Sequence, residues 1–402
     1  MEADEVQKKS IGMTAVVVFT AFMAWHTGFP QRLQAGPQIS SDFTIVVLPD
    51  TQYYTDGARG ATMDMFTAQT QWVAQNKTRN KIKAVIGLGD IVDNSNSTAE
   101  WQKADSAYRI LDQAGLAYAP VLGNHDYDDL GTQGKRAATH YNTYFGPARF
   151  SRYPWYGGGY PTGSNENFSI AFTAGTSNYL VIALEYYPRT QTLEWAQRVV
   201  NANPDKEVII ATHSYLDDDG TRILKGGRHG PQSEGLSSAN DNDAEEMWAK
   251  FISKNKRIIL VLSGHICQGI SIMARRSDRG ENGNVVHQLL ADYQWFTNGG
   301  GGYMRIMKFR PSKGVIEVRT YSPYLKAYLR DASNQFELKY APTPAGLGVG
   351  HLAAASLQAG LLAACLIAAV VIAALEEHTP CLLTLNFQTP TMQNFRDKQE
   401  SL

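Results

Sequence analysis

Apolar, β-branched runs that each end in a polar cluster constrain the fold of this chain more than any other feature. Three such runs, at 43–50, 82–90 and 117–122, are separated by two stretches with helical spacing of apolar residues, at 61–76 and 98–114. Continuous apolar runs of this length are typical of buried strands. The alternation of strand and helix predicts parallel strands with right-handed crossovers, and therefore an α/β fold.

The second half of the chain continues this pattern with two interruptions. Residues 127–165, rich in Tyr, Gly and Pro, and the polar loop 214–239 are predicted as insertions. The segments after 268 are predicted to form a run of antiparallel strands. The predicted strands are 168–172, 179–185, 208–212, 258–263, 269–274, 285–291, 303–309 and 315–321, and the predicted helices are 192–201 and 243–254.

Five polar clusters follow the apolar strands in chain order. In open α/β sheets, functional sites form at the carboxyl edge of the strands, where these clusters are expected to meet. A single Gly-Asp pair or a single histidine at a strand end indicates little, whereas the ordered set is difficult to attribute to chance. The clusters are Asp50-Thr-Gln52, Gly89-Asp90-Ile-Val-Asp93, Gly123-Asn124-His125-Asp126, Thr212-His213 and Gly264-His265-Ile-Cys267.

This ordered set resembles the calcineurin-like metallophosphoesterase family over residues 43–275, most sharply in the clusters around Asp90 and Asn124. The resemblance implies a β-sandwich flanked by helices. It also implies two divalent or trivalent metal ions (Mn, Fe or Zn) bridged by one aspartate. Such a pair of ions clamps a phosphoryl group and activates a water, so the expected activity is hydrolysis of a phosphomonoester or phosphodiester substrate.

The resemblance assigns a role to each residue that matches a motif position. Two aspartates would bind the first metal, and one of them would bridge to the second. A histidine beside the site would face the phosphate and stabilise developing charge or protonate the leaving oxygen. In this sequence the first metal falls to Asp50 and Asp90, the second to Asp90, Asn124, His213 and His265, and the phosphate to His125.

Two positions depart from the family pattern, and both belong to the first metal. Gln52 stands where the family has a histidine, and its carbonyl oxygen is a weaker ligand than imidazole. Cys267 replaces a second histidine, either as a thiolate ligand or as an inert buried thiol. The sequence therefore predicts a strong second site and a weaker first site. A rival function is a non-catalytic receptor or binding ectodomain with a degraded first site.

Apolar segments near both ends predict attachment to a membrane. Residues 1–35 contain the run Ile11–Trp25 after two lysines, as in a signal peptide or signal anchor. Residues 352–375 carry no charge and would extend about 36 Å as a helix, which is enough to span a bilayer. The expected organisation is a catalytic domain at 42–335, a linker at 336–350, a transmembrane helix and a polar tail at 376–402.

Composition excludes some classes and leaves the compartment open. A net charge of -1 gives no sign of a nucleic-acid surface, and three cysteines exclude a disulfide framework. Sequons at Asn76, Asn96 and Asn167 favour an extracellular or lumenal domain on a single-pass membrane glycoprotein. The alternative is a cytosolic enzyme whose end segments pack as helices. The sequence does not indicate an oligomeric state.

Overall fold

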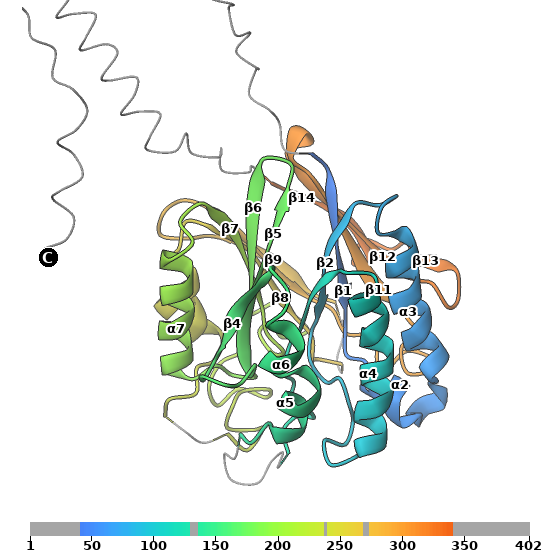
Figure 1. Cartoon of the computed structure of the whole chain (residues 1–402). Coiled ribbons are helices and arrows are strands. Elements are labelled where there is room, and N and C mark those ends of the chain that lie inside the picture. The colour runs from blue at the N-terminus through green and yellow to red at the C-terminus, as the bar shows by residue number, and fades with distance from the viewer. Residues whose placement is uncertain (1–40, 129–135, 237–238, 268–272, 341–402) are drawn as a thin grey trace, which may run out of the picture. The chain divides into compact units, whose positions relative to one another are not determined.

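Two seven-stranded sheets pack face to face, with helices on both outer surfaces (Figure 1). The structure, a computed structural model, describes residues 41–128, 136–236, 239–267 and 273–340. The chain therefore has the predicted mixed α/β architecture with two sheets.

The first sheet, called sheet A, has the strand order β13-β12-β11-β1-β2-β3, with β14 also paired to β12. Strands β1, β2 and β3 are parallel, as the βαβαβ pattern predicts, whereas β11 runs antiparallel to β1. Its strands are β1 (Phe43–Leu48), β2 (Ile82–Gly87), β3 (Ala117–Pro120), β11 (Met304–Arg310), β12 (Val315–Ser322), β13 (Ala327–Leu329) and β14 (Gln335–Lys339).

The second sheet, called sheet B, has the order β4-β5-β6-β7-β8-β10-β9. Strands β6, β7, β8 and β10 are parallel, and antiparallel strands flank them on both sides. Its strands are β4 (Tyr156–Tyr160), β5 (Asn167–Ala174), β6 (Ser177–Ala183), β7 (Lys206–Ala211), β8 (Ile258–Ser263), β9 (Arg275–Arg279) and β10 (Val285–Leu290).

Helices cover the outer faces of both sheets. In Figure 1, α3 and α4 lie on the side of sheet A, and α7 lies on the side of sheet B. Ser97 caps α4 by accepting a hydrogen bond from the Glu100 backbone N–H. The helices are α2 (Gln52–Asp56), α3 (Met63–Asn76), α4 (Thr98–Gln113), α5 (Thr139–Phe145), α6 (Pro147–Phe150), α7 (Thr190–Asn201) and α8 (Ala244–Met247), which continues as the π-helix η2 (Trp248–Ile252); η1 (Ala58–Gly60) and η3 (Pro311–Lys313) are 3-10 turns.

Strand β1 shows why the central strands are apolar on both faces. Ile45 and Val47 belong to the buried cluster shared by the two sheets. Val46 and Leu48 belong to the cluster that also contains Phe66 of α3. Since successive side chains point to opposite faces, a strand between the second sheet and the helices needs apolar residues at every position.

Both ends of the described chain lie at the same end of sheet A. The Phe43 ring stacks on Phe309 at 4.5 Å, and the Tyr340 ring meets Phe309 edge-on at 5.5 Å. Because β1 runs away from Phe43 toward Asp50, the chain enters and leaves opposite to the carboxyl edge of the parallel strands.

Two predictions about strands are corrected. The segment 285–291 was expected in an antiparallel run, but β10 pairs parallel with β8 and antiparallel only with β9. The strand expected at 269–274 falls mostly outside the described residues, and the observed strand is β9, with the sequence RRSDR. As the last strand of sheet B, β9 has one edge unpaired in the described chain, where charged side chains are favoured, so apolar periodicity does not reveal it.

The predicted end segments lie outside the described residues. Within the described ranges no helix is long and apolar enough to cross a membrane, and the span expected at 352–375 falls beyond them. The boundary expected at 335 cuts through β14, so the folded chain reaches Tyr340. The sequon at Asn167 is a correction: this side chain is fully buried, accepts from Glu185 N and donates to Tyr160 O, which leaves no room for a glycan.

Candidate metal centre

The carboxyl ends of strands from both sheets bring the predicted clusters together. Asp90 follows β2, His213 follows β7 and His265 follows β8. These three side chains offer ligand atoms that all lie within 4.8 Å of one another, in a geometry that can hold a metal ion. Asn124, which follows β3, joins them through its Oδ1, 2.7 Å from His213 Nε2. The residues predicted for the second metal therefore converge.

The hydrogen bonds of His213 indicate that this group of atoms receives a cation. Its Nδ1 lies 2.7 Å from the carbonyl oxygen of Leu88, and a carbonyl only accepts, so Nδ1 carries the proton. Its Nε2 then presents a lone pair to Asn124 Oδ1 and, at 3.1 Å, to Asp90 Oδ1. Three electron-pair donors that face one another require a proton or a metal ion between them.

At this centre the pKa values of His265 and Asp90 are lowered, which favours their ligand forms, whereas Asp90 outweighs burial and raises the pKa of His213. Burial, together with neighbouring His213, lowers the pKa of His265 to about 3, so its imidazole is neutral at physiological pH. Burial alone would raise the pKa of Asp90, but His213 and His125 outweigh it and hold the pKa below its usual range. Neutral imidazole and ionised carboxylate are the ligand forms of these residues.

Glycines in the motifs make room for these side chains. Gly89 has φ +103°, and a Cβ at this position would overlap the ring of His213. A Cβ on Gly264 would overlap Oδ1 of Asp50. Close packing between backbone and ligand side chains therefore explains two of the motif glycines.

Asp50 and Gln52, predicted for the first metal, follow β1 of sheet A. The Asp50 carboxylate accepts the His265 backbone N–H at 3.1 Å. Gln52 donates its Nε2 to Asp93 at 2.7 Å, and its buried Oε1 has no hydrogen-bond partner in the described chain. That free amide oxygen is available to a metal ion.

The surroundings of Cys267 favour the thiol over the thiolate. Among the described cysteines it is unpaired, and burial, reinforced by the nearby charge of Asp292, raises its pKa to about 12. A thiolate at this position would add negative charge to a region that already contains buried carboxylates.

His125 lies beside the ligands, and within the described residues its Nε2 has no hydrogen-bond partner. Its backbone N–H donates to Asp90 Oδ1 at 2.9 Å, and its Nδ1 donates to the Asp93 carbonyl at 2.8 Å. The side chain is 33% exposed, so Nε2 can meet a substrate. Burial opposes the charged form, but Asp90 and the Asp93 carbonyl outweigh it and raise the pKa of His125.

Asp126 supports the loops instead of orienting His125. It is fully buried and accepts the backbone N–H groups of Ile91, Val92 and Gly123 at 2.8 to 3.2 Å. These contacts tie the loop after β2 to the loop after β3. Of the two roles open for Asp126 on sequence grounds, the turn-capping role matches its hydrogen bonds.

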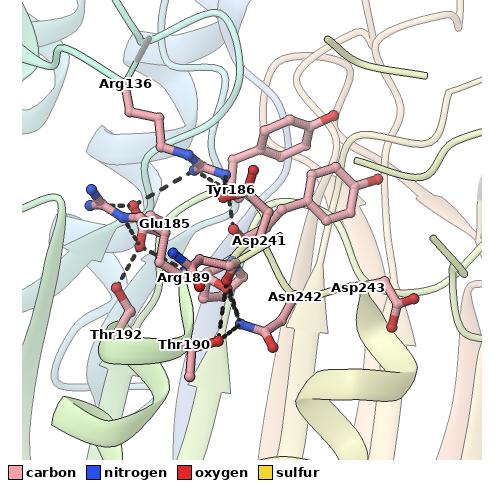
Figure 2. A network of polar contacts seen from close by, with 12 residues as sticks. Arg136, Glu185, Tyr186, Arg189, Thr190, Thr192, Asp241, Asn242 and Asp243 are labelled. Atoms are coloured by element: carbon pink, nitrogen blue, oxygen red, sulfur yellow. Dashed lines mark hydrogen bonds and ion pairs between the residues drawn. The ribbon is translucent and has the colours of Figure 1, made fainter. Parts of the chain in front are cut away.

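Tyr186 is a neighbour of the centre that sequence reasoning missed. Its hydroxyl lies 3.2 Å from His265 Nε2, and its ring is 5.1 Å from the His265 ring. Figure 2 shows how the loop after β6 is held: Arg136 donates to the Tyr186 carbonyl at 2.5 Å and pairs with Asp241 at 3.0 Å. Glu185, fully buried, lies 3.7 Å from the Arg136 guanidinium. No local motif marks Tyr186, because its position depends on contacts between distant loops.

Two facing sheets, with carboxylate, amide and imidazole donors that fit divalent metal ions at their carboxyl edge, define a protein of the metallophosphoesterase class. The chain belongs to the calcineurin-like phosphoesterase family, whose sequence profile it matches over residues 43–269. It is 30% identical over 292 residues to the uncharacterized protein YvnB of Bacillus subtilis (strain 168), a match that covers 72% of this chain and 20% of the relative. The chain thus spans about a fifth of the length of this relative.

Two solved structures are similar in fold at low sequence identity. A purple acid phosphatase from yellow lupin (Lupinus luteus) seeds has a TM-score of 0.45 and 13% identity, and the match covers 75% of this chain and 54% of that one. A dimetal phosphatase from Danio rerio has a TM-score of 0.43 and 10% identity, and the match covers 74% of this chain and 99% of that one.

Proposed function

We propose that this protein is a membrane-anchored, metal-dependent hydrolase of phosphomonoesters or phosphodiesters. The observation that carries the proposal is the convergence of Asp90, Asn124, His213 and His265, with the free Nε2 of His125 beside them. A pair of divalent ions bound here would polarise the phosphoryl oxygens and activate a water for attack.

The chain's own residues would position the ester and supply a proton. The Asp93 carbonyl holds the Nδ1–H of His125, so the proton available to substrate is on Nε2. Because the pKa of His125 is raised, the ring is protonated over a wider pH range and can donate to a phosphoryl or leaving-group oxygen. The loop that carries Tyr186 sits beside His265, with the Tyr186 hydroxyl 3.2 Å from His265 Nε2.

Hydrolysis of p-nitrophenyl phosphate and bis(p-nitrophenyl) phosphate tests this function. The protein should be stripped of metal and reloaded separately with Mn²⁺, Fe²⁺ or Zn²⁺, with His125→Ala as the control. We expect metal-dependent turnover of at least one ester. A wild-type protein that binds metal but hydrolyses neither ester with any ion would favour the rival function, a non-catalytic receptor or binding ectodomain, which the Gln52 and Cys267 replacements motivate.

We also propose that the catalytic domain is extracellular or lumenal and is held to the membrane by residues 352–375. The apolar composition of that segment and the exposed sequon at Asn96 support this location. Deletion of 352–375 should move the protein from a carbonate-resistant membrane fraction to the soluble fraction. A full chain that is carbonate-soluble and unglycosylated at Asn96 and Asn76 would instead point to the cytosolic alternative.

A further inference from the structure

We propose that Asp292 and Gln294 complete the first metal site in place of the two imidazoles missing at residues 52 and 267. The site then has oxygen donors only, from Asp50, Gln52, Asp90, Asp292 and Gln294, and prefers a hard divalent ion such as Mn²⁺ over Zn²⁺. This proposal rests on the proposed function, because it requires that metal binds at this edge of the sheets.

Strand pairing puts Asp292 beside the first site. In the parallel pair of β8 and β10, Leu290 lies opposite Ser263, and Ala291 N donates to the Ser263 carbonyl at 2.9 Å. Asp292 therefore stands next to Gly264 and His265, and the His265 backbone in turn donates to the Asp50 carboxylate. Asp50 follows β1 of sheet A and Asp292 follows β10 of sheet B, so each sheet contributes one aspartate beside the turn at residues 264–265.

The charges of these side chains are not balanced by the protein. Asp50, Asp90 and Asp292 are at most 3% exposed, and no lysine or arginine of the described ranges forms an ion pair with any of them. The His213 ring is the partner of Asp90 alone. Buried carboxylates without cationic partners destabilise a fold, and a bound divalent ion removes that cost.

Two buried amide oxygens provide an independent indication. Gln294 donates Nε2 to Asp292 Oδ2 at 3.1 Å, and Gln52 donates Nε2 to Asp93 Oδ1 at 2.7 Å. Since the NH₂ group of each amide faces a carboxylate, the orientation of each amide is fixed. The Oε1 atoms of Gln52 and Gln294 are then left buried, at 2% and 5% residue exposure, with no hydrogen-bond partner in the described chain. Such oxygens are costly to bury unless a cation or a hydrogen-bond donor reaches them.

Cys267 is adjacent to this set without joining it. Its thiol contacts the Gln294 side chain. In this arrangement Gln294 and Asp292 take the position that a second imidazole would fill, and Cys267 packs behind them.

The proposal is tested by equilibrium binding of Mn²⁺ to the full chain, in which the EPR signal measures the concentration of free Mn²⁺. We expect the wild type to bind two ions, Asp292→Asn to weaken one of them at least 10-fold, and Cys267→Ser to bind as the wild type does. A matched control is Asp331→Asn, because Asp331 also accepts a backbone N–H two residues ahead and a side-chain amide, but lies in the loop before β14. Excess Zn²⁺ should displace Mn²⁺ from the second site before the first.

Thermal unfolding separates a ligand from a turn-forming residue. If Asp292 is a ligand, metal-free Asp292→Asn is at least as stable as metal-free wild type, and the rise in Tm on adding Mn²⁺ becomes smaller. If Asp292 only holds the Gln294 turn, the metal-free variant melts lower and the Mn²⁺ shift is unchanged, which overturns the proposal. Should Asp292→Asn fail to fold, Gln294→Met keeps the side-chain length and must still weaken one ion.

The remaining outcomes are equally decisive. Loss of one ion in Cys267→Ser makes the thiolate the ligand and overturns the proposal. If the wild type binds only one Mn²⁺ ion even at millimolar Mn²⁺ and still hydrolyses ester, the proposal for the first metal site is overturned and the proposed function stands. A wild type that binds two Mn²⁺ ions, loses one in Asp292→Asn and hydrolyses no ester supports it, while the proposed function fails.

Discussion

At the scale of single residues, His125 is held so that only one ring nitrogen is available to substrate. Its Nδ1 is engaged by the Asp93 carbonyl, and its ring lies outside the convergent ligand atoms. His125→Ala is expected to lower kcat for p-nitrophenyl esters by about 10²–10⁴-fold, because it removes a positioned proton donor. The metal content of the purified variant should equal that of the wild type, and loss of metal in parallel with activity would show that His125 acts as a ligand.

Gly89 links backbone conformation to ligand position. Gly89→Ala places a Cβ against the His213 ring, so His213 must move and the second metal should be lost along with activity. Gly283→Ala is the matched control, since Gly283 also has positive φ, at +80°, but no atom lies within 4 Å of an added Cβ. The control should cost about 1 kcal/mol of unfolding free energy from backbone strain alone and keep its metal. Metal content and denaturant unfolding compare the two variants, and equal effects would contradict the steric argument.

The sequence predicts which residues meet at the site when each of them directly follows a strand, and it fails when a residue is positioned by contacts between distant loops. Asp90 and His213 could be predicted to meet because each follows an apolar run of a parallel strand. Asp292 also follows an apolar run, but the sequence predicts that run to be antiparallel, so the same argument does not extend to Asp292. Tyr186 gives no such signal, since its place beside His265 is fixed by Arg136, 50 residues earlier in the chain.

At the scale of elements, His287 connects the two sheets. It lies on β10 of sheet B, donates Nε2 to the Lys339 carbonyl of β14 in sheet A at 2.7 Å, and contacts Ser277 Oγ through Nδ1. Burial lowers the pKa of His287 in the folded protein below its ordinary value of 6.5. Between these two pKa values the unfolded chain binds the extra proton, so stability falls as the pH drops below about 6.5.

His287→Gln keeps an amide donor and removes this titration. The variant should lose less stability than wild type as the pH is lowered from 7 to 5, by at most about 1.4 kcal/mol per pH unit for one proton. Urea unfolding at several pH values measures the difference. Parallel pH profiles for the two proteins would show that His287 does not contribute.

The sequence predicts long helices with a clear apolar period, but it misses short helices and does not give the direction of a strand. Helices α3 and α4 lie within two residues of the segments expected from their apolar spacing. The short helix α2 was missed because Gln52–Asp56 is too short to show a helical period. The partner of β10 was mistaken because apolar periodicity identifies a strand without identifying its direction.

At the scale of the whole molecule, the Arg136 network fastens the insertion to the loops around the centre. The Arg136 side chain is 7% exposed, and its partners Glu185 and Asp241 are 0% and 2% exposed. Arg136→Met should destabilise the protein by about 3 kcal/mol, because it leaves the buried Asp241 carboxylate without its cation, whereas Glu185 keeps its ion pair with Arg189 at 2.8 Å. The double variant with Asp241→Asn should recover part of this loss, and a double-mutant cycle by chemical unfolding measures the coupling. Simple additivity of the two changes would contradict a direct pairing.

The arrangement of the two chain ends has a practical consequence. Phe43 and Tyr340 meet on Phe309, and the centre lies at the far end of β1, roughly 20 Å along the strand. A bead, a sensor surface or a fluorescent fusion partner attached through either end of the folded domain would therefore leave the candidate metal centre turned toward the bulk solution. The domain is suited to immobilised assays in which metal ions and esters must reach a tethered protein without hindrance from its support.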